Sequence, residues 1–335
     1  ANDHANSLLW QKVNTGEMPQ NNPALPQSQI DLIALWINEG ALEFPVTTFQ
    51  PQTTAALQTA VDLWVSDSAS AVATYGDIST WDVSLITDMS ELFKDKTTFN
   101  DDISNWDVSS VTSMTHMFNG AGNFNGDISN WDVSNVNGMG YLFNDADSFN
   151  QDISSWDVSN VTNMGAMFNL ASSFNQDLSS WDVSNVTVMK SLFRSSSFNA
   201  DISDWDVSSV TQMHEMFRNN ASFNQDISAW DVSSVTNMRE MFDLASSFNQ
   251  DLSSWDISQV NNFNSMFNNT ALNDTNRCAI HTSWSSNQNW PYDWSETCPH
   301  YSGPIWYIST TGSDSTGDGS EHNPFATIQI AIDSS

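Results

Sequence analysis

Positively charged residues are scarce in this chain. Lys and Arg number 8 against 40 Asp and Glu, which gives a formal net charge of −32 over 335 residues. This excess of negative charge would repel nucleic-acid phosphates and anionic membrane surfaces, so neither is an expected partner. It suits a protein in salty or calcium-containing surroundings, or one with a basic partner.

Long apolar runs are absent and cysteines are few. No run approaches the ~18–20 residues that cross a bilayer, so the sequence predicts no membrane span. The first residues lack the basic start and apolar run of a signal peptide, which suggests an internal piece of a longer chain or a mature form. The two cysteines, Cys278 and Cys298, have no second pair with which to hold a metal, and a disulfide in an exported protein is expected.

One motif occurs eight times. In the copy that starts at Asp152 it reads D-I-S-S-W-D-V-S-N-V-T-N-M, followed by M-F at 167–168. The copies are marked by tryptophans 25 residues apart, with one step of 24, namely Trp81, Trp106, Trp131, Trp156, Trp181, Trp205, Trp230 and Trp255. A fixed period of this length predicts a solenoid, in which each unit contacts only its neighbours.

Each copy has a fixed pattern of apolar residues. With the Ile of D-I-S as position 0, they fall at positions 0, 3, 5, 8, 11, 14, 15 and 21, which in the second copy begin at Ile103. The W-D-V step alternates as a strand does, whereas positions 8 to 15 have helical spacing. Ser109 and Ser110 lie between them as a helix cap. The pattern therefore predicts a short extended piece, a turn, a short helix and a return loop.

The regions outside the copies predict a chain of several parts. Helices are expected near residues 7–13, 28–41 and 54–71, the last as an amphipathic cap for the first copy. The expected parts are a helical tail at 1–44, a linker at 45–53, an N-terminal cap at 54–76, eight repeats at 77–270, a C-terminal cap with the disulfide at 271–303 and the truncated start of another domain at 304–335.

The motif F-N-x-D-I-S-x-W-D-V-S-x-V-T-x-M-x-x-M-F resembles the BspA-like leucine-rich-repeat surface proteins over residues 57–300. The resemblance implies a bacterial cell-surface or secreted location, a role in adhesion or protein binding, and no catalytic residues. The expected function is that of a non-catalytic module that binds extracellular proteins or glycans, or that acts as a spacer. The expected fold is an α/β repeat, a leucine-rich-repeat-like β/α solenoid in a monomer. Trp, Met and Phe stand where such repeats carry Leu, so we expect it to be thin and straight.

Two flanking segments show other resemblances. In residues 1–44, S-L-L-W-Q-K-V, G-E-M-P and the apolar run after them resemble the end of a c-type cytochrome domain, which implies Met18 as an axial haem ligand. The C-x-x-C-H attachment motif is absent, so this segment alone would not hold covalent haem. From Pro304, I-W-Y-I-S, a turn-rich loop and a helix-like run resemble the opening of a pectate-lyase-like right-handed β-helix. This implies an alternative function, the substrate-targeting part of a polysaccharide-degrading enzyme.

Two aspartates recur in every copy, one four residues before Trp and one directly after it. In the second and fourth copies these are Asp102, Asp107, Asp152 and Asp157. They are interpreted as turn and cap residues, with a ladder of calcium sites as the alternative. The loop that holds Asp314 and Asp318 resembles a calcium loop in composition, with a plain connector as its alternative.

The remaining polar columns predict structure rather than chemistry. In the first seven copies an asparagine follows the last Phe and should form an internal ladder bonded to loop backbone, namely Asn100, Asn125, Asn150, Asn175, Asn199, Asn224 and Asn249. The six histidines share no repeat position and no i, i+4 spacing, so neither a zinc site nor an enzyme is expected. The repeated outer surface, rather than any one residue, is the candidate for function.

Overall fold

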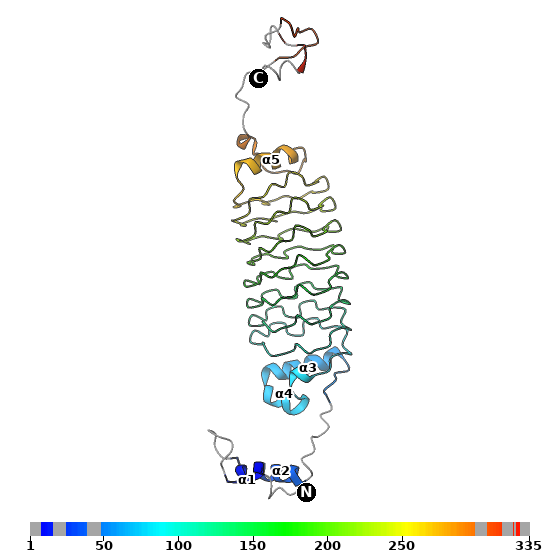
Figure 1. The fold of residues 1–335 in the computed structure, drawn as a ribbon, viewed down its shortest axis with the longest axis vertical. Helices are drawn as coiled ribbons and strands as arrows, with labels where there is room; N and C mark the ends of the chain where they lie inside the picture. Colours follow the sequence, from blue (N-terminus) through cyan, green and yellow to red (C-terminus); the bar gives the residue numbers. More distant parts are fainter. Residues whose placement is uncertain are drawn as a thin grey trace.

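The repeated segment forms a stack of coils, one coil for each copy. The computed structural model describes residues 8–15, 25–38, 48–298, 307–316, 324 and 326–328. Figure 1 shows the coils rising from the helices α3 and α4 at one end to α5 at the other. Single parallel β-bridges join position 10 of successive copies, from Asp88↔Ser113 to Asn237↔Asn262. The predicted repeat architecture is confirmed.

The predicted β/α leucine-rich-repeat solenoid is wrong. Within the described residues there is no β-strand, because each bridge is isolated. The helices lie outside the copies, apart from one 3-10 turn, η2 (Ile78–Thr80), in the first of them. Positions 8 to 15, where the spacing predicted a helix, form consecutive tight turns instead.

Left-handed backbone explains why no helix forms. Positions 13 and 17 have positive φ in the copies, for example 60° at His116 and 57° at Asp145. A left-handed residue every four positions prevents the helical i to i−4 pattern. In the second copy Met117 N–H donates to Met114 O at 3.0 Å and Asn119 N–H to His116 O at 3.1 Å, which are i to i−3 turn bonds. Such turns place positions 11, 14 and 15 inward, as a helix would.

Alternate peptide groups join each coil to the next. Met114 N–H donates to Gly138 O at 3.0 Å, and His116 N–H donates to Gly140 O at 3.0 Å. Phe118 and Gly120 continue the series with the carbonyls of Leu142 and Asn144 at 2.9 and 2.8 Å. We call this series the backbone ladder. It depends on main-chain groups alone and leaves the side chains at positions 12, 13, 16 and 17 free to vary.

The core consists of stacked columns of identical side chains. Phe118 and Phe143 lie 5.7 Å apart with an interplanar angle of 6°, and Phe143 and Phe168 lie 5.8 Å apart. Such offset aromatic pairs contribute about 0.5–1.5 kcal/mol each beyond their burial. The Trp of each copy also finds a partner for its indole N–H, as where Trp156 Nε1 donates to Ile128 O at 3.1 Å. The columns therefore hold neighbouring copies in register.

The first copy is covered by α3 (Thr54–Ser66), which α4 (Ser68–Tyr75) follows. α3 buries Leu57, Val61 and Trp64. Its Thr54 hydroxyl donates to Asp88 O at 2.8 Å, and its Gln58 amide donates to Leu92 O at 3.1 Å. In later copies the carbonyls at these two positions accept ladder amides. Side chains of α3 thus replace a preceding copy.

The last copy is covered by α5 (Asp274–Trp284) and the segment after it, which includes η3 (Ser295–Thr297). Trp284 is fully buried, and its ring lies 6.2 Å from that of Trp255 and continues the Trp column. The Tyr292 hydroxyl accepts from Phe267 N–H at 2.9 Å, in place of a ladder carbonyl. The predicted disulfide, Cys278–Cys298, is confirmed and ties α5 to the end of this segment.

Two further helices, α1 (Leu8–Asn14) and α2 (Gln27–Asn38), contact one another near the N-terminus. Among their described side chains, those of Val13 and Ile30 are buried. No helix in the described part of the chain is both long and apolar enough to cross a membrane.

Candidate functional site

Both aspartate columns form turns. In the second copy Asp102 Oδ1 accepts from Ser104 N at 2.9 Å and from Ser104 Oγ at 2.7 Å. Asp107 Oδ1 accepts from Ser109 N and Oγ at 3.1 and 2.6 Å. In the fourth copy Asp157 makes the same two contacts with Ser159, and Asp152 Oδ1 accepts from Ser154 N at 3.0 Å. Each carboxylate therefore fixes the turn that follows it.

These hydrogen bonds lower the pKa of Asp102, Asp152 and Asp157. The Ser104 hydroxyl, followed by its backbone N–H, lowers the pKa of Asp102 below its ordinary value. Ser154 lowers the pKa of Asp152 in the same way, and Ser159 that of Asp157. The bonds form with the charged carboxylate, so they favour that form. At neutral pH the columns present rows of full negative charges to solvent.

The aspartates are not grouped as a metal site requires. Within the described residues no three His, Cys, Asp or Glu side chains gather as a cation site. Asp314 accepts from Ala326 N at 2.8 Å and Thr327 N at 2.9 Å, so it orders its own loop. Asp318 and the haem-ligand candidate Met18 lie outside the described residues. Calcium binding at any of these positions stays a prediction.

The predicted asparagine ladder links the copies, but the prediction that it is internal is wrong. Asn125 Oδ1 accepts from Asn150 N at 2.9 Å, and Asn150 Oδ1 accepts from Asn175 N at 3.0 Å. Gln176 Nε2 adds a bond to Asn150 O at 3.0 Å. Unlike the Phe before them, these asparagines lie at the surface. Their role is structural.

The copies differ most along the ladder face, which we define as the side chains at positions 12, 13, 16 and 17 beside the backbone ladder. Position 13 carries Glu91, His116, Tyr141, Ala166, Ser191, Glu215, Glu240 and Ser265. Position 16 carries Lys94, Asn119, Asn144, Asn169, Arg194, Arg218, Asp243 and Asn268. Because main-chain bonds hold the ladder, the fold does not dictate these choices.

An aromatic pair occupies one part of the ladder face. The imidazole of His116 and the ring of Tyr141 lie 4.5 Å apart and are inclined by 5°, one from each of two adjacent copies. Burial, and then the charge of Lys94, lowers the pKa of His116 below its ordinary value. The imidazole is therefore neutral at pH 7. This pair forms a half-exposed platform, whereas the core rings of both copies are buried.

An ion-pair cluster occupies another part of the ladder face, in the fifth to seventh copies. It consists of Arg194, Glu215, Arg218, Arg239, Glu240 and Asp243. Arg218 Nε lies 2.9 Å from Glu240 Oε2 and 3.1 Å from Asp243 Oδ2. Arg239 pairs with Glu215 and Glu240, and Arg194 Nε lies 3.5 Å from Glu215 Oε2. With Lys190 beside it, this region holds four of the chain's 8 Lys and Arg.

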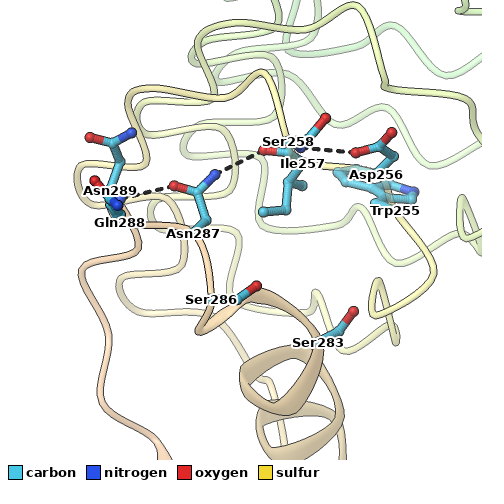
Figure 2. A pocket seen from close by; sticks show the side chains of 9 residues that line it. All are labelled: Trp255, Asp256, Ile257, Ser258, Ser283, Ser286, Asn287, Gln288 and Asn289. Carbon is cyan, nitrogen blue, oxygen red and sulfur yellow. Dashed lines mark hydrogen bonds between the residues drawn. The ribbon is translucent and has the colours of Figure 1, made fainter.

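A pocket of about 500 Å³ lies where the last copy meets the C-terminal cap. Figure 2 shows the Asp256–Ser258 segment on one side and Ser283, Ser286, Asn287 and Asn289 on the other. Asn287 connects the two sides, because its Nδ2 donates to Ile257 O at 2.9 Å while its Oδ1 accepts from Asn289 N at 2.9 Å. Polar side chains make up most of the wall.

The repeat motif itself points to neither the ladder face nor the pocket. The residues of the ladder face carry a signal, since they are the positions at which the copies disagree. The far wall of the pocket carries none, because Ser283 to Asn289 follow the last copy and break its period. Only the return of the chain against Asp256 brings them to the site.

Two overlapping segments, residues 64–181 and 167–280, match the family model described as "Mycoplasma protein of unknown function, DUF285". Together they span the stack and much of its caps, which is more than half of the 335 residues. No curated protein and no solved structure matches the chain.

Proposed function

We propose, from the premise that this chain belongs to the Mycoplasma DUF285 family of unknown function, that it is a non-catalytic binding module of a secreted or surface-exposed bacterial protein. Its partners would be extracellular proteins or glycans, and the ladder face would be the surface that contacts them. The chain's repeat character and its disulfide are consistent with a module that works outside the cytoplasm.

One observation carries this proposal: the copies diverge where main-chain bonds, rather than side chains, join one copy to the next. In the Trp–Asp segment (positions −1 to 6, Asp152–Ser159 in the fourth copy) nearly every column repeats, because each residue is buried or bonded. On the ladder face the copies differ and form distinct patches, the His116–Tyr141 platform and the ion-pair cluster. Varied side chains on a rigid regular scaffold are typical of repeat proteins that bind partners.

The test is a binding screen of the full chain against glycans and extracellular-matrix proteins, followed by exchanges within the ladder face. Tyr141→Ser and His116→Ser introduce the residue that two other copies carry at this position, Ser191 and Ser265, with φ of 54° and 56°. Both variants should therefore fold normally, and they should weaken the binding of any partner that contacts the His116–Tyr141 platform.

The matched control is Asn130→Ser, an exposed position at which the fourth and fifth copies carry Ser155 and Ser180. This exchange should leave binding unchanged. A screen without any partner, or a partner whose affinity survives both platform exchanges and disruption of the ion-pair cluster by Arg218→Asn, would contradict the proposal and favour a spacer.

A further inference from the structure

The pocket exists because the C-terminal cap replaces a ninth copy only in part. Between inner copies an asparagine at position 7 donates to the carbonyl at position 6 of the copy before, as Asn135 Nδ2 does to Ser109 O at 2.8 Å. After the last copy Asn287 Nδ2 donates to Ile257 O and Val260 O instead. Ser258, which is the position-6 residue here, consequently lines the pocket rather than a joint between copies.

The pocket wall holds polar groups of a kind that form hydrogen bonds within the stack in earlier copies. In six earlier copies the hydroxyl at position 6 donates to the Asp two residues before it, at 2.5 to 2.6 Å. In the last copy the bond to Asp256 Oδ1, at 2.9 Å, comes from Ser258 N. Within the described part of the chain the hydroxyls of Ser258 and Ser286 and the amides of Gln288 and Asn289 make no side-chain hydrogen bond. Four donor–acceptor groups and one carboxylate thus face a single space.

We propose that this pocket binds a neutral saccharide. A sugar ring carries several hydroxyls, each both donor and acceptor, which match serine hydroxyls, side-chain amides and one carboxylate. A volume of about 500 Å³ lies within the range of ligand pockets and leaves room for one or two sugar rings. Trp255 and Ile257 add a narrow apolar strip to the wall.

Other ligand classes fit the pocket less well. The lining holds no Lys, Arg or His, so an anion would find no positive partner. A divalent cation would find one carboxylate, and no three potential ligands gather anywhere in the described residues. A peptide anchored by an apolar side chain needs apolar wall, yet Trp255 and Ile257 are only 3% and 7% exposed.

The test is titration of the full chain with neutral oligosaccharides: cellohexaose, xylohexaose, mannohexaose, maltohexaose and chitohexaose. Calorimetry would measure affinity, and tryptophan fluorescence would respond because Trp255 lines the pocket. At least one sugar should bind. Asp256→Ala should weaken it roughly tenfold or more, which is the loss expected for a hydrogen bond to a charged acceptor.

Asp231→Ala is the matched control. Asp231 holds the same position in the preceding copy and makes the same bond, from Ser233 N at 3.0 Å, but lies outside the pocket. It should leave the affinity unchanged. Because Asp256→Ala could loosen the end of the stack, Gln288→Ala and Asn289→Ala, which remove exposed side chains, form a second arm and should weaken binding several-fold.

Three results would overturn the proposal: no sugar binds, both Asp variants weaken binding equally, or the variants at Gln288 and Asn289 bind as the parent does. A protein partner that these pocket variants lose would reassign the pocket to peptide binding. The pocket and the ladder face share no residue. Tyr141→Ser should therefore leave sugar binding intact, and failure here is distinguishable from failure of the ladder-face function.

Discussion

The Trp–Asp segment and the ladder segment (positions 10–17, Asn163–Leu170 in the fourth copy) join the same two copies by different means. In the Trp–Asp segment side chains make the joint, as where Trp156 Nε1 donates to Ile128 O at 3.1 Å. In the ladder segment the main chain makes it, as where Met139 N–H donates to Asn163 O at 3.1 Å. A joint made by side chains keeps their identity constant. A joint made by main chain allows it to change.

The largest expected effect is that of Trp156→Ala. This substitution leaves a cavity in the middle of the Trp column and removes an inter-copy bond, so we expect a loss of about 3–5 kcal/mol in the free energy of unfolding. Tyr141→Ser, on the ladder face of the preceding copy, should change it by less than about 0.5 kcal/mol. Urea unfolding followed by circular dichroism measures both. Similar losses for the two variants would remove the distinction between the segments.

The second largest effect is expected from loss of the disulfide at the C-terminal end of the stack, where no further copy follows. The Cys278–Cys298 bond closes a loop of 20 residues, and its loss through Cys278→Ser with Cys298→Ser should cost about 3 kcal/mol. Hydrogen exchange should show the change in α5 and the last copy first. Uniform loss of protection along the stack would mean that the end does not fray separately.

A smaller effect is expected from the asparagine column. Asn150→Ala removes the acceptor for Asn175 N, a bond of 3.0 Å, and should cost about 1 kcal/mol. Gly126→Ala, at the neighbouring position 23 where the fifth copy carries Ala200, alters a surface position without removing an inter-copy bond. Thermal unfolding of the two variants compares the loss of an inter-copy hydrogen bond with a change at a neighbouring position that removes none. Equal midpoints would show that the asparagine ladder adds no stability.

The smallest expected effect is that of a single aspartate charge on the stability of the fold. It should be stabilising in the Trp–Asp segment and destabilising in the ladder segment. Asp152 has a lowered pKa when folded, so its stabilising contribution is present above the ordinary Asp value of 3.8 and is lost as the pH falls through the folded pKa. In the ladder segment desolvation, then the charges of Asp147 and Asp95, raise the pKa of Asp145. Its charge therefore destabilises the fold at neutral pH, and this cost is relieved as the pH falls through its raised pKa.

At pH 7, Asp152→Asn should lower the midpoint of thermal unfolding slightly, and Asp145→Asn should raise it. Both differences in melting midpoint between variant and parent should shrink as the pH falls. The difference for Asp145→Asn should begin to shrink at a higher pH than the difference for Asp152→Asn. Melting curves from pH 7 to pH 3 test this. A stabilising Asp152→Asn would contradict the role given to the Ser154 bonds.

The sequence predicts the stack and its core, but not the conformation of each copy. The Trp column alone establishes the period, and the two cysteines predict their own bond. The helix prediction fails because positions 11, 14 and 15 face inward equally in a helix and in three-residue turns. The left-handed residues that decide between them are hidden at position 13, where Tyr141, Glu215 and Glu240 have positive φ although their residue types do not favour it.

The binding surfaces are predictable only in part. Disagreement among copies marks the ladder face, so the column at position 13 could be singled out without a structure. The pairing of Arg218 with Glu240 and Asp243 could be suspected from their spacing of about one period. The pocket could not be predicted, because its far wall comes from the segment after the last copy and is placed by how that segment folds back.

The direction of the backbone ladder gives the stack an electrical polarity. In the second copy the ladder amides all point towards the C-terminal end, and the carbonyls of the same peptide groups point towards the N-terminal end. Their dipoles add from coil to coil, as they do along an α-helix, whereas alternating strand dipoles in a sheet largely cancel. The N-terminal end of the stack therefore presents carbonyl oxygens, and the C-terminal end presents N–H groups. The groups that cover them match: hydroxyl and amide hydrogens of Thr54 and Gln58 at the first, the phenolic oxygen of Tyr292 at the second.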